Sequence, residues 1–322
     1  MIKKIPSLID MHVHLREPGF TQKETIETGL NSAIKGGYGA VLAMPNTNPV
    51  CDNIETIKEI LEISRKLNKA IEVYPVGAVT KNLNTDILVN FKELKNAGCI
   101  AFSNDGMSTR MVKEALLSNE LILSHLEDET KEAIEQIGIY KSLVKNGFQP
   151  KLHFCHISKK STLEVIKKAK NEGLKITAET CPHYFIFTKN DLDETGRFKM
   201  NPPLGEIEDK LAVIEAIKNG TIDVISTDHA PHTNEEKLKP YNESPNGITG
   251  LETAFSLTYQ TFGLDLTVEK MAIAPRKILG INPKKEVEVD LDKNWIVKGV
   301  NLQSKCKITP YENMELKGKI LC

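Results

Sequence analysis

The sequence lacks several features that would assign it to a class at once. Its apolar runs fall well short of the roughly 20 residues that cross a bilayer, and the N-terminus has no apolar signal-peptide core. The six cysteines contain no Cys-x-x-Cys pair, which argues against a disulfide framework or a cysteine zinc site. A net charge of −1 gives no general attraction to nucleic acid or anionic membranes. We therefore expect a cytoplasmic protein with buried, reduced thiols.

No glycine-rich nucleotide fingerprint follows any apolar run, which weakens the case for a doubly wound sheet. Instead, short apolar runs alternate with amphipathic segments, the pattern of parallel βα units. The expected strands are residues 7–11, 40–44, 71–76, 99–102, 121–124, 151–155, 174–178 and 222–226. Helical patterns lie between them, for example at residues 54–68 and 162–172, the second followed by Gly173 as a stop. The sequence predicts an α/β fold, a (β/α)8 TIM barrel.

The pattern changes after about residue 284, where short extended pieces replace the alternation. They are expected at residues 286–290, 295–300, 305–309 and 316–321. We predict a barrel over residues 1–284 and a reduced C-terminal β extension over residues 285–322, packed on the barrel.

Histidines and acids recur at the ends of the expected strands. In a strand alternate side chains point the same way, so the two histidines of the first strand project to one side. Each residue alone has an ordinary alternative, such as an Asp-Gly turn or a hydrogen-bonded core histidine. Because reactive residues of a barrel gather at the carboxyl ends of its strands, we expect one cluster. Its members are His12, His14, Asp105, His125, His156 and Asp228.

Four imidazoles and two carboxylates exceed what one tetrahedral zinc requires, and they favour two bridged metals. Imidazole with carboxylate suits zinc best, although cobalt or manganese can substitute. Such metals lower the pKa of a bound water and create a nucleophile without serine or cysteine. The chemistry indicated is hydrolysis or its reversal.

Several motifs give the chain a family resemblance. They are HVHLREPG at 12–19, MPNTNP at 44–49, FSNDG at 102–106, CPHY at 181–184, NPPL at 201–204, and STDHAPH at 226–232 with Lys237 beyond it. In this combination, order and separation, the sequence resembles the dihydroorotases of the amidohydrolase superfamily over nearly its whole length.

The resemblance implies two zinc ions per subunit. His12 and His14 would hold one zinc and His125 and His156 the other. Asp105 would bridge them, where many relatives use a carboxylated lysine. Asp228 would bind the first metal and carry the proton between a metal-bridging hydroxide and the ring nitrogen.

The implied reaction is the reversible cyclisation of N-carbamoyl-L-aspartate to L-dihydroorotate, a step of pyrimidine synthesis. The substrate carboxylate would contact Arg16, Asn46 and His232, which suits the bidentate grip of arginine. Asn201 would position the ring. A homodimer and association with an aspartate carbamoyltransferase stay open as partners, whereas neither nucleic acid nor a membrane is expected.

Some features depart from the family pattern. The small β-domain that precedes the barrel in many relatives is missing or reduced here, Asn104 stands where a second aspartate is common, and Gly205 where a basic residue is usual. We expect His183 to be structural or to support the ligands. The loop at residues 229–247 is open to two interpretations, a mobile lid or an ordinary surface loop.

Three rival functions remain. Allantoinases and hydantoinases open related cyclic amides with similar metals, and the fold alone does not fix the substrate. An inactive relative that serves as a partner subunit is the third, and it would be expected to lose metal ligands, all of which are present here.

Overall fold

A closed ring of parallel strands organises the computed structural model, which describes residues 1–283 and 285–321. The ring strands are β2 (Leu8–Val13), β3 (Tyr38–Ala43), β4 (Glu72–Pro75), β5 (Gly77–Ala78), β6 (Phe102–Ser103), β7 (Leu121–Ser124), β8 (Lys151–Phe154), β9 (Thr177–Thr180) and β10 (Val224–Ile225). They pair in the orders β2-β3-β4 and β5-β6-β7-β8-β9-β10.

Two short contacts complete this ring. Val76, between β4 and β5, donates its N–H to Ala43 while Gly77 donates to Ala101, so β4 and β5 form one barrel strand that pairs on both sides. At the other end Val13 bridges in parallel to His229, and the His14 N–H donates to the His229 carbonyl at 2.8 Å. The predicted (β/α)8 barrel is confirmed.

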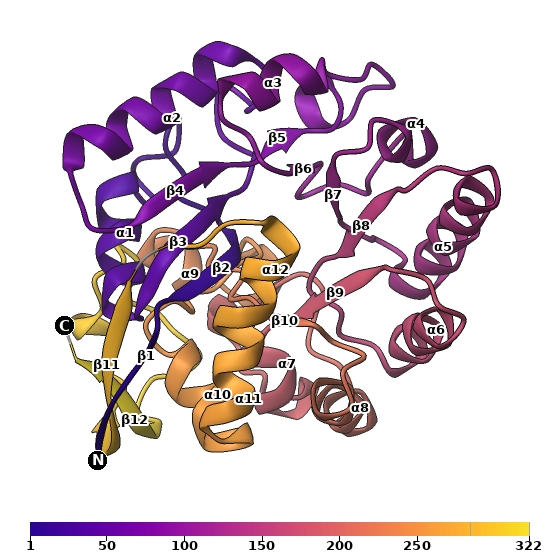
Figure 1. Cartoon of the computed structure of the whole chain (residues 1–322). Coiled ribbons are helices and arrows are strands. Elements are labelled where there is room, and N and C mark those ends of the chain that lie inside the picture. Colours follow the sequence, from indigo (N-terminus) through magenta and orange to yellow (C-terminus); the bar gives the residue numbers. More distant parts are fainter. Residues whose placement is uncertain (284, 322) are drawn as a thin grey trace.

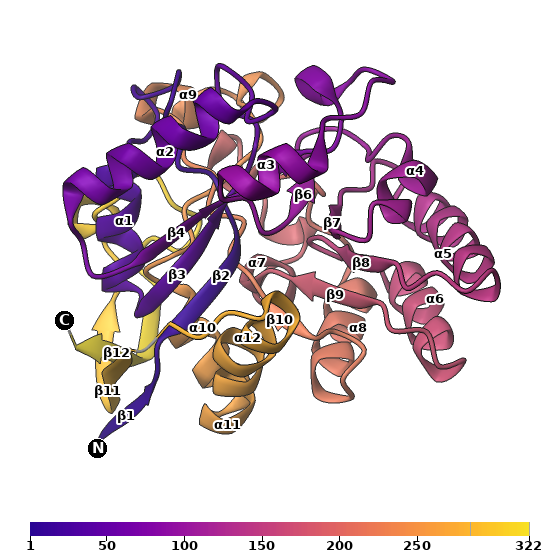
Figure 2. The ribbon, with the colours of Figure 1, turned by 45° about the horizontal axis from the view of Figure 1, so that its top comes forward.

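Helices surround the ring, as Figures 1 and 2 show. They are α1 (Ile26–Lys35), α2 (Ile54–Leu67), α3 (Phe91–Ala97), α4 (Val112–Leu117), α5 (Glu129–Lys145), α6 (Lys160–Asn171), α7 (Pro182–Ile186), α8 (Ile207–Lys218), α9 (Asn234–Leu238), α10 (Ala254–Phe262), α11 (Leu264–Val268) and α12 (Ala274–Leu279). A π-helical turn, Glu269–Ile273, joins α11 to α12. In the described part of the chain, no helix has the length and apolar character to span a membrane.

The barrel interior is a packed core. Met11, Leu42, Val76, Leu123 and Val224 come from five of its strands, pack in one inner cluster and are almost fully buried. Residues of α12 pack against this inner cluster and close one end of the barrel. Figure 2 places α12 at the end opposite α9, which leaves the carboxyl ends of the strands open for a site.

The structure corrects two of the expected strands. The fourth begins at Phe102 rather than residue 99, and the seventh runs over Thr177–Thr180 rather than 174–178. In both cases an apolar residue follows a left-handed glycine that ends a helix: Cys99 N–H bonds back to Leu94, and Leu174 N–H to Ala169. These residues belong to helix C-caps, where a hydrophobic contact just after the glycine is common.

The extension forms a three-stranded antiparallel sheet in the order β1-β11-β12. Its strands are β1 (Ile2–Pro6), β11 (Glu286–Ile296) and β12 (Glu315–Leu321), and both chain ends lie beside it in Figure 1. The first strand was not expected, because its exposed Lys3 and Lys4 break the apolar pattern, as on many edge strands.

The expected pieces at 286–290 and 295–300 are one strand, β11, with an irregularity between Asp290 and Asn294. The piece at 305–309 is not a strand, because its backbone bonds to side chains of other elements: Lys305 N–H donates to Glu24, and Lys307 N–H to Asn234. The proposed boundary residue Lys284 and Cys322 lie outside the described residues. The other five cysteines are free and buried, as expected.

The packing of β12 generates a stability prediction. Leu316 is fully buried beneath this strand, and on the neighbouring β11 the Trp295 indole donates to Ser256 of α10 at 3.1 Å. We expect Leu316→Ala to lower the free energy of unfolding by about 2–5 kcal/mol, the usual cost of a large-to-small core substitution. Urea unfolding followed by circular dichroism measures it, with the more exposed Leu321→Ala as the control.

One transition that shifts as a whole would mean that the extension and barrel unfold together. A barrel transition that keeps its midpoint in Leu316→Ala would mean that the extension is an independent unit.

Candidate metal centre

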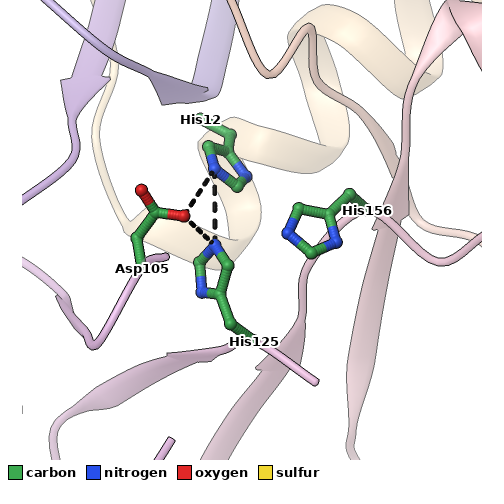
Figure 3. Close-up of side chains that lie close together, drawn as sticks. All are labelled: His12, Asp105, His125 and His156. Carbon is green, nitrogen blue, oxygen red and sulfur yellow. Dashed lines mark hydrogen bonds and ion pairs between the residues drawn. The ribbon is translucent and has the colours of Figure 1, made fainter. Parts of the chain in front are cut away.

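Six predicted ligands from five barrel strands and their loops meet at the carboxyl end of the barrel. The candidate ligand atoms of His12, Asp105, His125 and His156 all lie within 4.8 Å of one another, as do those of His12, His14 and Asp228. Figure 3 shows the first group, in which one oxygen of the Asp105 carboxylate faces both the His12 and the His125 ring from the side. Its Oδ1 is 2.6 Å from His125 Nε2 and 3.6 Å from His12 Nε2.

Asp228 occupies the other side of this cluster. Its Oδ1 lies 3.2 Å from His14 Nε2 and 3.5 Å from His12 Nε2, while Asp105 Oδ2 lies 3.3 Å from the same His14 atom. His12 therefore belongs to both groups of ligand atoms, and Asp105 contacts histidines of both. The predicted ligands thus form two overlapping sets, and a third group of possible ligands, His12 with Cys155 and Glu179, shares the same histidine.

Three of the imidazoles are oriented by a bond at the far nitrogen. The Nδ1 atoms of His12, His14 and His125 lie 2.8, 2.8 and 2.9 Å from Glu179 Oε1, Asn46 Oδ1 and Ser103 Oγ, respectively. An Nδ1–H that donates outward leaves the Nε2 lone pair facing the cluster. Metal-binding histidines almost always have such a partner.

The electrostatics of the cluster also suit a cation. Burial alone would raise the pKa of Asp105, but His14 and His125 hold it well below its usual range. Burial would also raise the pKa of Asp228, but the neighbouring imidazoles lower it to about 2. Burial together with His125 lowers the pKa of His156 to about 3. At neutral pH Asp105 and Asp228 are therefore ionised and His156 is unprotonated, the forms that bind metals. Burial would lower the pKa of His12 and His125, but the neighbouring acids raise it, to about 10 at His125, so a metal that binds there displaces protons.

The donor set fits one or two divalent metal ions. All six residues are at most 7% exposed, and their two carboxylates place negative charge and lone pairs in a buried space. Such charge is costly unless a cation or protons neutralise it. Imidazole and carboxylate ligands are those that zinc takes in hydrolases.

Three residues of this rim have a left-handed backbone. The φ angles are 61° at Arg16, 36° at His156 and 47° at Asp228, although none of them is glycine. Such conformations cost of the order of 1–3 kcal/mol and persist where the surroundings enforce them. At His156 and Asp228 they immediately follow the barrel strands, where the chain turns out of the barrel while the side chain still faces the cluster.

A cavity of about 200 Å³ opens over the cluster, and every predicted site residue except His12 lines it. This volume is below the roughly 300–1,000 Å³ of pockets for drug-sized ligands and suits a small ring. His12 lies beneath the cavity and is fully buried. Asn201, the most exposed of the set, stands at the cavity wall.

The wall opposite the carboxylates is cationic. Arg16 donates from Nε to the Pro231 carbonyl at 3.1 Å, and its Nη2 lies 3.3 Å from His232 Nε2. His232 Nε2 also lies 2.7 Å from the Asn246 carbonyl, and its Nδ1 lies 3.1 Å from Lys23 Nζ. Burial, with Arg16 and Lys23, lowers the pKa of His232 to about 3, so this ring is neutral and donates its single N–H to Asn246.

Asn46 lies between the cavity and the ligands. Its Oδ1 faces His14, and its Nδ2 donates to Asp105 Oδ2 at 2.7 Å, so both of its polar atoms contact predicted ligands. Its expected contact with a substrate carboxylate stays a prediction, and the structure adds a role in orienting these two ligands.

Sequence reasoning missed two supporting residues, Glu179 and Ser103. Glu179 is fully buried at the end of β9 and accepts from Ser226 at 2.5 Å as well as facing His12. The available signal was position: Ser103 lies within the recognised FSNDG motif and ends β6, and Glu179 lies in β9 two residues before the CPHY motif.

The departures from the family pattern lie outside the cluster. Asn104 turns away and accepts the backbone N–H groups of Val79 and Thr80. Gly205 precedes α8, where a Cβ would meet Asp209 at 2.6 Å.

His183 is fully buried, and burial lowers its pKa to about 4. Neither of its ring nitrogens has a hydrogen-bond partner within residues 1–283 and 285–321, and it is not in either ligand group.

A barrel with this buried imidazole and carboxylate cluster at the carboxyl ends of its strands has the ligands of a metal-dependent hydrolase. Solved structures share this fold: an L-hydantoinase (dihydropyrimidinase) from Arthrobacter aurescens superposes with a TM-score of 0.82 at 22% identity, covering 98% of this chain and 82% of that one. A dihydropyrimidinase from Brevibacillus agri gives 0.79 at 19% identity, with coverage of 99% and 83%. At these identities the likeness establishes the fold.

Sequence comparison specifies the family. A family model described as dihydro-orotase-like matches residues 3–136. The dihydroorotase of Acetivibrio thermocellus is 37% identical over 361 residues, covering 98% of this chain and 84% of that protein. That of Syntrophus aciditrophicus is 38% identical over 362 residues, with the same coverage. The chain belongs to the dihydroorotase family.

The bond between Glu179 and His12 yields a prediction. We expect Glu179→Gln to reduce metal affinity by about 10- to 100-fold, because the amide no longer accepts from His12 Nδ1–H as a charged group and orients the ring less strongly. Competition with a chelator, read by elemental analysis of the protein, measures it.

The control is Glu164→Gln, an exposed carboxylate on α6. Equal metal retention by the two variants at every chelator concentration would remove Glu179 from the metal centre.

Proposed function

We propose that the protein is a zinc-dependent dihydroorotase, which catalyses the reversible cyclisation of N-carbamoyl-L-aspartate to L-dihydroorotate in pyrimidine biosynthesis. The observation that carries this proposal is that a cationic wall with Arg16 and a metal-ligand cluster line the same small cavity. The substrate has a carboxylate for the first and an amide for the second. Membership of the family supports the same substrate.

The metal content that we propose is two zinc ions per subunit. His12, His14 and Asp228 would hold one, and His125 and His156 the other, with Asp105 between them. When bound, the metals would activate water and withdraw charge from the amide carbonyl. This assignment is supported by the two overlapping ligand groups, each of which includes one carboxylate.

Asp228 is the group that we assign to proton transfer. It lines the cavity and is ionised at neutral pH, so it can accept a proton. In ring opening, water adds to the amide carbonyl and its proton passes to an Asp228 oxygen. The C–N bond then breaks, and the same oxygen returns the proton to the departing nitrogen. Ring closure follows the reverse sequence.

Arg16 is the group that we assign to the substrate carboxylate. Its half-buried guanidinium lines the cavity; Nε donates to the backbone carbonyl of Pro231, and Nη2 lies 3.3 Å from His232 Nε2. The remaining N–H groups can meet a carboxylate in a two-pronged arrangement. His232, Asn46 and Asn201 would complete the wall and fix the orientation of the ring.

The test of function is turnover by the zinc-reconstituted protein with L-dihydroorotate and N-carbamoyl-L-aspartate, beside hydantoin and allantoin. Activity on the first pair alone is expected. Turnover of either comparison ring would overturn the substrate assignment. No turnover of any of the four with two metals bound would favour an inactive partner subunit, for which association with an aspartate carbamoyltransferase is the relevant measurement.

Removal of each of the two assigned side chains should change the kinetics in a different way. Asp228→Ala is expected to lower kcat at least about 100-fold in both directions, because it removes the proton carrier. Arg16→Ala is expected to raise KM on the order of 100-fold with a smaller effect on kcat, because it removes a charge-assisted pair of bonds. Steady-state kinetics measure both.

Exposed Arg65→Ala on α2 is the matched control for the arginine, and metal analysis accompanies Asp228→Ala, since the residue is also a proposed ligand. Near-normal turnover by Asp228→Ala with its metals retained would refute the proton-transfer assignment.

A further inference from the structure

Lys237, in α9, is a buried lysine whose charge has no ion-pair partner. Its side chain is 1% exposed, and its Nζ donates to the carbonyls of Lys199 at 3.1 Å and Pro245 at 3.0 Å. Within residues 1–283 and 285–321 it makes no ion pair with a carboxylate. Burial of an ammonium is costly, so a lysine in this position calls for a compensating group.

The two carbonyls belong to the loops that form one wall of the cavity. Lys199 precedes Asn201 by two residues, and its carbonyl also accepts the Gly247 N–H at 3.0 Å. Pro245 precedes Asn246, whose carbonyl faces His232. Asn201, Asn246 and Gly247 all line the cavity, so the ammonium of Lys237 joins both wall loops directly behind the surface that the ligand meets.

The charges around the cavity are divided between its two ends. The carboxylates Asp105 and Asp228 lie with the imidazoles at one end. Arg16 and Lys237 are at the other, and neither makes an ion pair in the part of the chain that the structure describes, whereas nearby Lys23 pairs with Glu236 at 3.3 Å. Glu236 is a carboxylate whose charge acts on both, without an ion pair to either among the described residues. A half-buried and a buried cation without a paired carboxylate favour a ligand that supplies negative charge at that end.

We propose that Lys237 is a specificity-determining residue of this site: its positive charge strengthens binding of the carboxylate-bearing ring, and its hydrogen bonds hold the two wall loops together. This inference rests on the proposed function. Lys237 acts through the two wall loops and does not contact the substrate itself.

The charge and the hydrogen bonds can be separated by pH. Burial is the main cause that lowers the pKa of Lys237, to about 8, and nearby Lys199 and Arg16 act in the same direction. Cys306 and Glu236 oppose them, and His232 is the remaining titratable neighbour, neutral throughout this range.

As the pH rises through about 8 the ammonium loses its proton. A neutral amine still has two N–H groups, one for each carbonyl, so the wall keeps its bonds while the charge disappears. KM for an anionic substrate should therefore rise above pH 8.

The experiment measures kcat and KM for L-dihydroorotate from pH 7 to 9.5 in the zinc-reconstituted parent protein, Lys237→Met, Lys237→Arg and the exposed neighbour Lys239→Met as a control. At pH 7 we expect Lys237→Met to raise KM on the order of tenfold, as for a charge that acts through a low-dielectric wall, with kcat within about threefold. Its KM should then stay flat with pH. Lys237→Arg should keep KM low to pH 9.5, because arginine keeps its charge. Lys239→Met should follow the parent.

Three results would overturn the proposal: KM of Lys237→Met within about twofold of the parent at pH 7, a parent KM that does not rise above pH 8, or the same rise in both Lys237 variants. A purely structural role predicts lower thermal stability and kcat without a change in the pH dependence of KM. If the variants are too unstable to assay, a flat parent profile still decides against the proposal. Failure of the proposed function is distinct, because the parent itself would then not turn over L-dihydroorotate.

Discussion

The site depends on one constraint: two ionised carboxylates and four imidazoles lie in a single buried cluster. Asp105 contacts rings from both ligand groups, so its carboxylate fixes how closely β2 and the loop after β6 approach β7. A rim of apolar side chains in the same place would pack without any buried charge. The cluster is favourable only when a cation or protons neutralise its carboxylates, so binding of a metal there would be coupled to the final geometry of the rim.

The residues behind the ligands share that constraint. Glu179, Asn46 and Ser103 each take the outward nitrogen of one histidine and so direct the other nitrogen into the cluster. Because each lies on a different strand or loop of the barrel, the orientation of the rings is set by closure of the barrel itself. A change in one supporting side chain should alter metal affinity before it alters the fold.

The sequence predicted the barrel and all six candidate ligands because both depend on local patterns. Strand periodicity puts His12 and His14 on one side, and the strand ends bring the other four to the same rim. It did not predict β1, Glu179 or the bonds of residues 305–307, since these depend on partners far away in the sequence: His12 lies 167 residues from Glu179, and Asn234 lies 73 residues from Lys307. Cys99 and Leu174 were misassigned to strands because an apolar residue after a helix-ending glycine has the same local composition as a strand start.

The C-terminal loop shows what those distant partners contribute. Ser304 donates to Glu24 at 2.5 Å and Lys305 N–H at 3.2 Å, while the Glu24 carboxylate lies 3.5 Å from His229 Nε2. The His229 carbonyl in turn accepts the His14 N–H, and its neighbour is Asp228. A buried carboxylate with a pKa held below its usual range thus connects the extension to the strand-closing residue of the barrel. The extension therefore helps to fix the positions of His14 and Asp228 and does not merely pack against the outside of the barrel.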